Sequence, residues 1–213
     1  MNNLVKTGEK YMKKKLKVLG ISVLSLILVL IIGIGMIFKG EIRTLISFKQ
    51  LNEHPFYEMT YHADYNLDEF LINGAATDDE LVSFVTKQIL KGVSFDVNPD
   101  GACSTFIATN LEDENLFGRN FDYVHSIGLI VRTQPKNGYK SISLVNLNHL
   151  GLSLENMPTK NLINRIVTLA APYAPLDGMN EKGLAIGVLV IQDGKVHQNT
   201  GKVPITTTSA IRM

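Results

Sequence analysis

Cysteine is nearly absent from this sequence: Cys103 is the only one in 213 residues. A single thiol cannot form an internal disulfide, and an unpaired cysteine in an exported protein is a candidate reactive thiol. Neither sign of charge is in excess, because 21 lysines and arginines face 20 aspartates and glutamates. The net charge of +1 therefore gives no indication of a nucleic-acid partner.

Patterns that hold metals or cofactors are also missing. None of the five histidines stands at metal-ligand spacing from a second histidine, cysteine or carboxylate; they are His54, His62, His125, His149 and His197. The Gly-x-Gly pattern falls inside a hydrophobic run, which excludes a phosphate-binding loop. The sequence shows no internal repeat and no low-complexity tract. We therefore expect no metal and no cofactor.

One long hydrophobic run is present near the N-terminus. Residues 18–38 carry no charge and, as a helix, would span roughly 31 Å, enough to cross the apolar core of a bilayer. Six lysines precede this run, at positions 6, 10, 13, 14, 15 and 17. The positive-inside rule then places residues 1–17 in the cytoplasm and everything after Lys39 outside. We expect an uncleaved, single-pass anchor in the cell membrane.

A cleaved signal peptide is the alternative, and it would imply secretion. Signal peptides normally have a shorter apolar region, of about 7 to 15 residues, followed by a small-x-small cleavage site. Gly33-Ile34-Gly35 is a weak candidate for such a site.

Between the anchor and Cys103, the clearest element is a helix that begins at Thr77. Thr77 and Glu80 form a capping box, an apolar face follows, and Gly92 ends the helix. Three tyrosines follow one another at intervals of four residues, at Tyr57, Tyr61 and Tyr65. This spacing favours one packed face of a helix. Residues 98–101, Asn-Pro-Asp-Gly, predict an exposed turn just before Cys103.

From Cys103 onward the pattern changes to strands. Residues 104–109 and 116–121 flank a polar loop and predict a hairpin, and residues 127–133 and 141–145 flank Asn137-Gly138 and predict another. Residues 160–170 are helical and Pro172 closes them. Residues 184–191 predict an apolar strand buried on both faces. Residues 204–213 predict a strand end, a cap and the first turn of a helix.

The predicted first hairpin places Cys103 opposite or next to Asp122, with Arg119 within reach. A cation favours the charged form of a thiol, and a carboxylate orients a base, so the three residues suit a thiolate nucleophile. A register slip of one residue would reverse the faces. Without such chemistry, the same residues are a small buried side chain and a surface ion pair.

Three motifs follow one another in the sequence: Cys-Ser-Thr-Phe at 103–106, Gly-Arg-Asn-Phe-Asp at 118–122, and Asp-Gly-Met-Asn-Glu-Lys-Gly-Leu at 177–184. In this order they resemble the choloylglycine hydrolase superfamily of N-terminal-nucleophile (Ntn) hydrolases. This group includes penicillin V acylase, N-acylethanolamine acid amidase, acid ceramidase and isopenicillin N acyltransferase. The resemblance covers roughly residues 45 to 213.

The resemblance implies a role for each motif. Cys103 would be the nucleophile, freed by self-cleavage of the Ala102–Cys103 bond, with its own α-amine as general base. Arg119 would face the thiolate, Asp122 would hold the α-amine, and Asn180 would donate to the oxyanion. From the residues alone, Asn180 is equally a turn residue.

The fold that follows is α+β: an αββα Ntn sandwich preceded by one transmembrane helix. We expect a basic tail (1–17), an anchor (18–38), a pro-segment (39–102) and the N-terminal part of the catalytic domain (103–213). The family's second asparagine and further arginine have no counterpart here, so we expect an incomplete sandwich and a sequence truncated at its C-terminus. The expected activity is hydrolysis of linear C–N amide bonds in small N-acylated substrates. The alternatives are acyl transfer by the same residues, or an inactive anchored protein that only binds.

Overall fold

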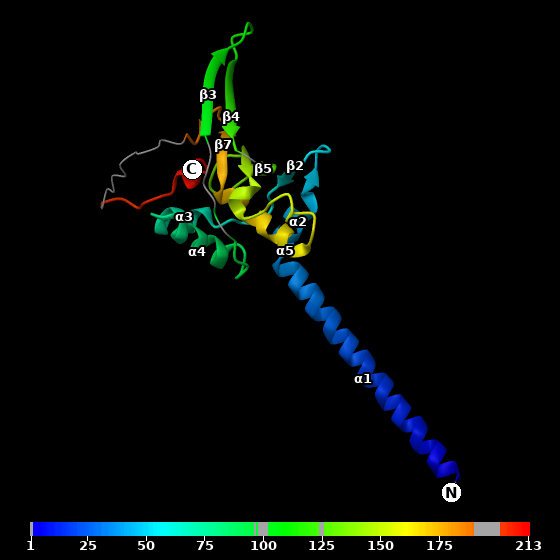
Figure 1. Cartoon of the computed structure of the whole chain (residues 1–213). Helices are drawn as coiled ribbons and strands as arrows, with labels where there is room; N and C mark the ends of the chain where they lie inside the picture. Colours follow the sequence, from blue (N-terminus) through cyan, green and yellow to red (C-terminus); the bar gives the residue numbers. More distant parts are fainter. Residues whose placement is uncertain (1, 96, 98–101, 124–125, 190–200) are drawn as a thin grey trace.

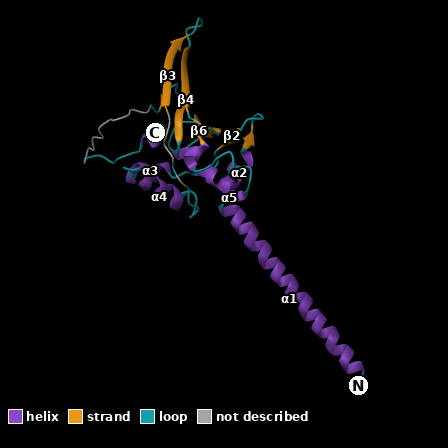
Figure 2. Cartoon of the chain, viewed as in Figure 1, coloured by secondary structure: helices purple, strands orange, loops and turns teal. Residues whose placement is uncertain are grey.

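The computed structural model describes residues 2–95, 97, 102–123, 126–189 and 201–213. It is a mixed α/β protein with one sheet of six strands, a separate two-stranded hairpin and one long N-terminal helix that projects from the body (Figures 1 and 2). The predicted turn at residues 98–101 lies outside the described residues.

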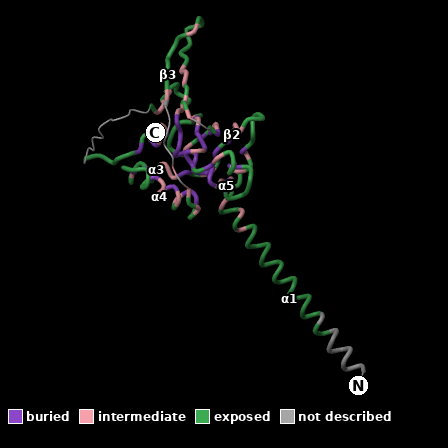
Figure 3. Tube along the Cα trace, in the orientation of Figure 1, coloured by how far each residue is buried: buried purple, intermediate pink, exposed green. Residues whose placement is uncertain are grey.

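Helix α1 (Asn2–Ile37) contains the predicted hydrophobic run. Its segment Lys14–Ile37 is long and apolar enough to cross a membrane, and it is not buried against the protein (Figure 3). By length and composition alone, a signal sequence would pass the same test. The run is therefore a helix, as predicted.

The next segment contributes α2 (Lys39–Ser47), β1 (Lys49–Gln50), β2 (Phe56–Thr60), α3 (Leu67–Asn73) and α4 (Asp78–Gln88). Helix α4 confirms the predicted start, because the Thr77 side chain accepts a hydrogen bond from the amide of Glu80 at 3.2 Å. The Glu80 carboxylate accepts a hydrogen bond from the amide of Ala76 at 2.7 Å, one residue before the position a regular capping box would use.

The six-stranded sheet has the order β1-β2-β5-β6-β7-β8. Strands β5 (Gly128–Thr133) and β6 (Ser141–Asn146) pair antiparallel across residues 134–140, which confirms the hairpin predicted there. Strands β7 (Pro175–Asn180) and β8 (Ala185–Gly187) continue antiparallel, whereas β2 lies parallel to β5. Residues from before Cys103 thus form part of the same sheet as residues from after it.

The predicted helix face of three tyrosines is wrong. Tyr57 lies in strand β2, Tyr61 follows that strand, and Tyr65 precedes α3, although all three are buried. A spacing of four places side chains on one face of a strand as well as of a helix, because strand periodicity is two. The spacing alone could not distinguish the two elements.

The predicted helix at residues 160–170 is split in two. Helix α5 (Leu162–Val167) begins at the Asn161 cap and continues as a 3-10 helix, η2 (Thr168–Tyr173). Pro172 lies inside η2 instead of closing the helix. A shorter 3-10 helix, η1 (Leu147–Leu150), follows β6.

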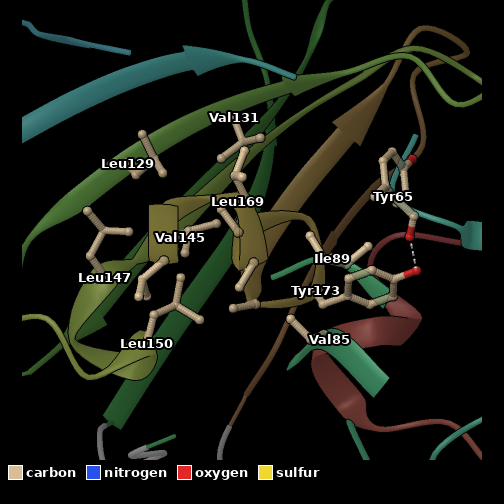
Figure 4. Packing of buried hydrophobic residues seen from close by; sticks show 14 of the residues in the cluster. Tyr65, Val85, Ile89, Leu129, Val131, Val145, Leu147, Leu150, Leu169 and Tyr173 are labelled. Carbon is tan, nitrogen blue, oxygen red and sulfur yellow. Dashed lines mark hydrogen bonds between the residues drawn. The ribbon is translucent and has the colours of Figure 1, made fainter. Parts of the chain in front are cut away.

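The core forms between the sheet and the helices that cover it. Buried side chains from β2, β5 and β6 meet those from α4, η1 and η2, and Figure 4 shows part of this cluster. The Tyr173 hydroxyl donates to the backbone carbonyl of Tyr65 at 2.5 Å, which joins η2 to the segment before α3 (Figure 4). Core contributions from both sides of Cys103 make the two halves of the protein one folding unit.

The last elements differ from expectation at two points. Strand β8 is short and lies at the edge of the sheet, with Leu184, Ile186 and Leu189 exposed, so the predicted burial on both faces is wrong for the described residues. Residues 190 and 191 lie outside the described ranges. The helical turn predicted within residues 204–213 is present as α6 (Thr207–Ala210), but the strand end predicted before it is wrong, because residues 203–206 form no strand. The buried guanidinium of Arg212 then donates hydrogen bonds to three hydroxyls of β5 and β6 and to one carbonyl of η2.

Candidate active site

Cys103 and Arg119 meet on one face of a hairpin. Strand β3 (Ala102–Thr109) pairs antiparallel with β4 (Asn115–Asp122), with Cys103 opposite Phe121 and Thr105 opposite Arg119. Opposite residues share a face in an antiparallel pair, so Cys103 and Arg119 are diagonal neighbours on that face. The hairpin and its register confirm the predicted pairing.

Arg119 bonds directly to the cysteine sulfur. Its Nη2 donates to Cys103 Sγ at 3.1 Å and to the carbonyl of Val188 at 2.7 Å, and its Nη1 donates to the carbonyl of Asn120. The side chain is only 6% exposed. A guanidinium held this way can stabilise negative charge on the sulfur, because hydrogen bonds to ionised groups are the strong ones.

Asp177 is the residue near this pair that sequence reasoning missed. Its Oδ2 lies 3.9 Å from Arg119 Nε, which makes no hydrogen bond to any described group. Burial raises the pKa of the Asp177 carboxyl, and the positive charge of Arg119 opposes that rise. Asp177 stood inside the third motif, but contact between β7 and the hairpin is tertiary and leaves no local pattern.

The sulfur lies at the wall of an apolar cavity of about 310 Å³. Cys103 itself is partly buried. The cavity is lined mostly by apolar side chains from α4, β4, η1, η2 and the segments around β7 and β8; they include Leu81, Val85, Phe121, Leu150, Tyr173, Leu176 and Val188. A cavity with an apolar wall and a few polar groups is the usual form of a small-molecule site.

His149 also lines this cavity, and no motif in the sequence singled it out. Its ring lies edge-on to Phe121, at 5.6 Å between centroids, and to Tyr123, at 5.7 Å. Because Phe121 is the cross-strand partner of Cys103, the imidazole and the thiol approach the same residue.

Asp122 lies one residue away from the Cys103 pair. It is opposite Ala102, so its carboxylate lies on the other face of the hairpin from the sulfur. The carboxylate is exposed and accepts a hydrogen bond from Asn120 Nδ2 at 2.6 Å. Asp122 is thus next to the Ala102–Cys103 peptide and not beside the thiol.

Asn180 is not brought to this site. Its Oδ1 accepts from the amides of Lys182 at 2.9 Å and Leu184 at 3.1 Å, in the turn between β7 and β8. It lines other cavities and not the one that contains Cys103. Three residues of extended strand, roughly 10 Å, separate it from Asp177. Its contacts match the turn alternative.

Among the described residues, no group of three or more histidine, cysteine, aspartate or glutamate side chains is arranged to bind a metal ion.

Comparison of the sequence and structure with protein-family models, with curated proteins and with solved structures found no match.

Proposed function

We propose that this protein is a membrane-anchored, cysteine-type Ntn hydrolase of the choloylglycine hydrolase superfamily that cleaves linear amide bonds of N-acylated compounds. The observation that carries the proposal is the 3.1 Å hydrogen bond from Arg119 to the Cys103 sulfur at the wall of an apolar cavity. A thiolate is the nucleophilic form of cysteine, and an adjacent cation favours it.

Self-cleavage would come first. Cys103 Sγ attacks the carbonyl carbon of Ala102, the C–N bond breaks, and a thioester forms while the nitrogen of Cys103 leaves as an amine. Water then hydrolyses the thioester, which frees the Ala102 carboxylate and restores the thiol. Cys103 would remain at the start of β3, held by its pairing with Phe121.

The two pieces would stay together after cleavage. Strand β2 pairs with β5 over five residues, and its Tyr57 and Met59 side chains are buried in the shared core. Phe70 and Val85, also from before Cys103, are fully buried as well. Cleavage of one peptide bond removes none of these contacts, so the anchor would keep the catalytic piece at the membrane.

In the amide reaction, the new α-amine of Cys103 acts as general base. An α-amine titrates near pH 7.7 to 8.0, close to working conditions, whereas a peptide nitrogen cannot accept a proton. The sulfur adds to the substrate carbonyl, the amine half leaves with the transferred proton, and water hydrolyses the acyl-enzyme. Arg119 stabilises the sulfur charge, Asp177 positions Arg119, and Asp122 orients the α-amine. The oxyanion role of Asn180 rests on the resemblance alone.

The cavity indicates which half of the substrate it accepts. An apolar acyl group matches its lining, and the carbonyl would then lie next to the sulfur. The test is release of amine from N-lauroyl and N-acetyl amides by the purified full-length protein. We expect turnover that favours the longer acyl group and is abolished by Cys103→Ala. Equal release by Cys103→Ala would contradict the proposal. Product ratios with an added amine measure the share of acyl transfer.

His149 supports one other mechanism. Its place on the wall of the same cavity makes it a candidate base for Cys103 in a protein that never cleaves itself. His149→Gln would then abolish turnover, and the uncleaved protein would be the active form. Under the proposed mechanism, His149→Gln retains turnover and only the cleaved protein is active.

A further inference from the structure

The exposed side of helix α2 combines apolar and basic residues. Lys39, Ile42, Arg43 and Ile46 are all exposed and follow the spacing of a single helix face. Ile42 is 41% exposed and Ile46 is 77% exposed, whereas Thr44 on the opposite side is fully buried. An exposed helix face of this composition is typical of helices that lie in a membrane interface.

Helix α5 adds two further exposed apolar side chains. Leu162 is 69% exposed and Ile163 is 62% exposed. The Arg165 guanidinium joins the two helices, because its Nη1 donates to the carbonyls of Leu45 at 3.2 Å and Phe48 at 3.3 Å. Figure 1 shows α2 and α5 where α1 meets the body. We call Ile42, Ile46, Leu162 and Ile163 the membrane-proximal patch.

No free linker separates this patch from α1. The amide of Phe38 donates to the carbonyl of Ile34 at 3.0 Å, and the amide of Ile42 donates to the carbonyl of Phe38 at 2.9 Å. The last helical bond of α1 and the first of α2 therefore both use Phe38, whose own φ of −98° and ψ of 24° are not helical. The two helices meet at this one residue, with no loop between them.

Helix α2 is fixed equally firmly to the body. A Cβ added at Gly40 would lie 2.8 Å from the Cα of Ala63, so the two backbones are in close contact. The Thr44 hydroxyl accepts a hydrogen bond from the amide of His62 at 2.8 Å. With α2 held in this way, the membrane-proximal patch keeps its position beside the end of α1.

We propose that the membrane-proximal patch lies in the headgroup region of the bilayer that α1 enters, with Lys39 and Arg43 against anionic lipid phosphates. The inference rests on α1 being retained as an anchor, as in the proposed function. Phe38, the single residue between α1 and α2, is not helical (φ −98°, ψ 24°), so α2 does not extend α1 straight out of the interfacial zone, which is roughly 5–7 Å thick on each side of the apolar core. Lysine and arginine at this depth place their charged ends among the headgroups while their stems cover apolar surface.

The test uses the full-length protein in vesicles of phosphatidylcholine mixed with phosphatidylglycerol. Cys103→Ser removes the natural thiol, and single cysteines are then introduced by Ile46→Cys or Ile163→Cys and labelled with bimane. The matched controls are Ile72→Cys in α3 and Ile107→Cys in β3, since these isoleucines are 74% and 78% exposed. Lipids spin-labelled at the headgroup are the quenchers.

We expect several-fold stronger quenching at positions 46 and 163 than at positions 72 and 107. Equal quenching at all four positions, or none at 46 and 163, would overturn the proposal. Quenching at positions 46 and 163 should be stronger in vesicles that contain phosphatidylglycerol than in phosphatidylcholine alone, and the double substitution Lys39→Gln, Arg43→Gln should reduce this difference. An unchanged difference would show that Lys39 and Arg43 do not contact anionic headgroups. The assay needs no catalysis, so its failure is distinguishable from failure of the proposed activity.

Discussion

Replacement of Arg119 by methionine should slow every reaction of the Cys103 thiol. In the structure, Arg119 Nη2 donates to the sulfur at 3.1 Å, and the guanidinium is nearly buried. Methionine keeps most of the length and the apolar stem of the side chain but supplies no donor and no charge. The sulfur then loses both the hydrogen bond and the neighbouring positive charge that Arg119 supplies.

The size of the effect follows from the strength of that hydrogen bond. A hydrogen bond to a charged group contributes about 1.5–3 kcal/mol, which corresponds to roughly 10- to 150-fold in rate. Cys103 is only partly buried, so solvent screens part of this interaction. We therefore expect a loss near the lower end, about 10-fold.

Alkylation by iodoacetamide at pH 7 measures this loss cleanly, because the protein has one cysteine and the label reports a single site. Arg119→Lys keeps the charge and should lose less. Arg132→Met is the matched control, since Arg132 is exposed on β5 and does not line the Cys103 cavity. Thermal melting verifies that each variant is folded. An alkylation rate of Arg119→Met equal to that of wild type would refute the assigned role.

Three further substitutions test the site and the fold. Burial raises the pKa of Asp177, so the stability that this carboxyl contributes is greatest at low pH and is lost as pH rises through the raised pKa. The unfolding free energy of Asp177→Asn should therefore fall less than that of wild type between about pH 4 and pH 7. An equal fall for the two proteins would contradict this. Thr77→Ala should cost about 1 kcal/mol in denaturant unfolding through loss of the α4 cap, whereas Thr77→Ser should not. Gly74→Ala should destabilise more than Gly92→Ala: both glycines have positive φ, but only at Gly74 would a Cβ lie 2.2 Å from the carbonyl oxygen of Pro204. Equal melting temperatures of the two alanine variants would show that this close contact does not matter.

Local signals predicted the elements that carry the site. Alternation of side chains and the polar loop at residues 111–114 predicted the β3–β4 hairpin and brought Cys103 beside Arg119. Asn137-Gly138 marked the β5–β6 connection, and Thr77 marked the start of α4. Each of these depends on residues close in sequence, which is the range over which turn and capping chemistry acts.

Tertiary contacts explain what the sequence did not predict. The parallel pairing of β2 with β5 joins segments about 70 residues apart, and no local pattern encodes it. Asp177 reaches Arg119 only because β7 and the segment after β8 lie beside the hairpin. The apolar run from Leu184 predicted a buried strand. Its described part contains the edge strand β8, and Leu184, Ile186 and Leu189 are exposed.

The central claim is that Cys103 becomes an N-terminal residue, and intact-mass spectrometry of the purified full-length protein tests it most directly. We predict two co-purifying fragments, the second beginning at Cys103, and a single uncleaved species for Cys103→Ala. A wild-type protein that keeps the mass of the intact chain after prolonged incubation at mildly acidic and neutral pH would contradict the account.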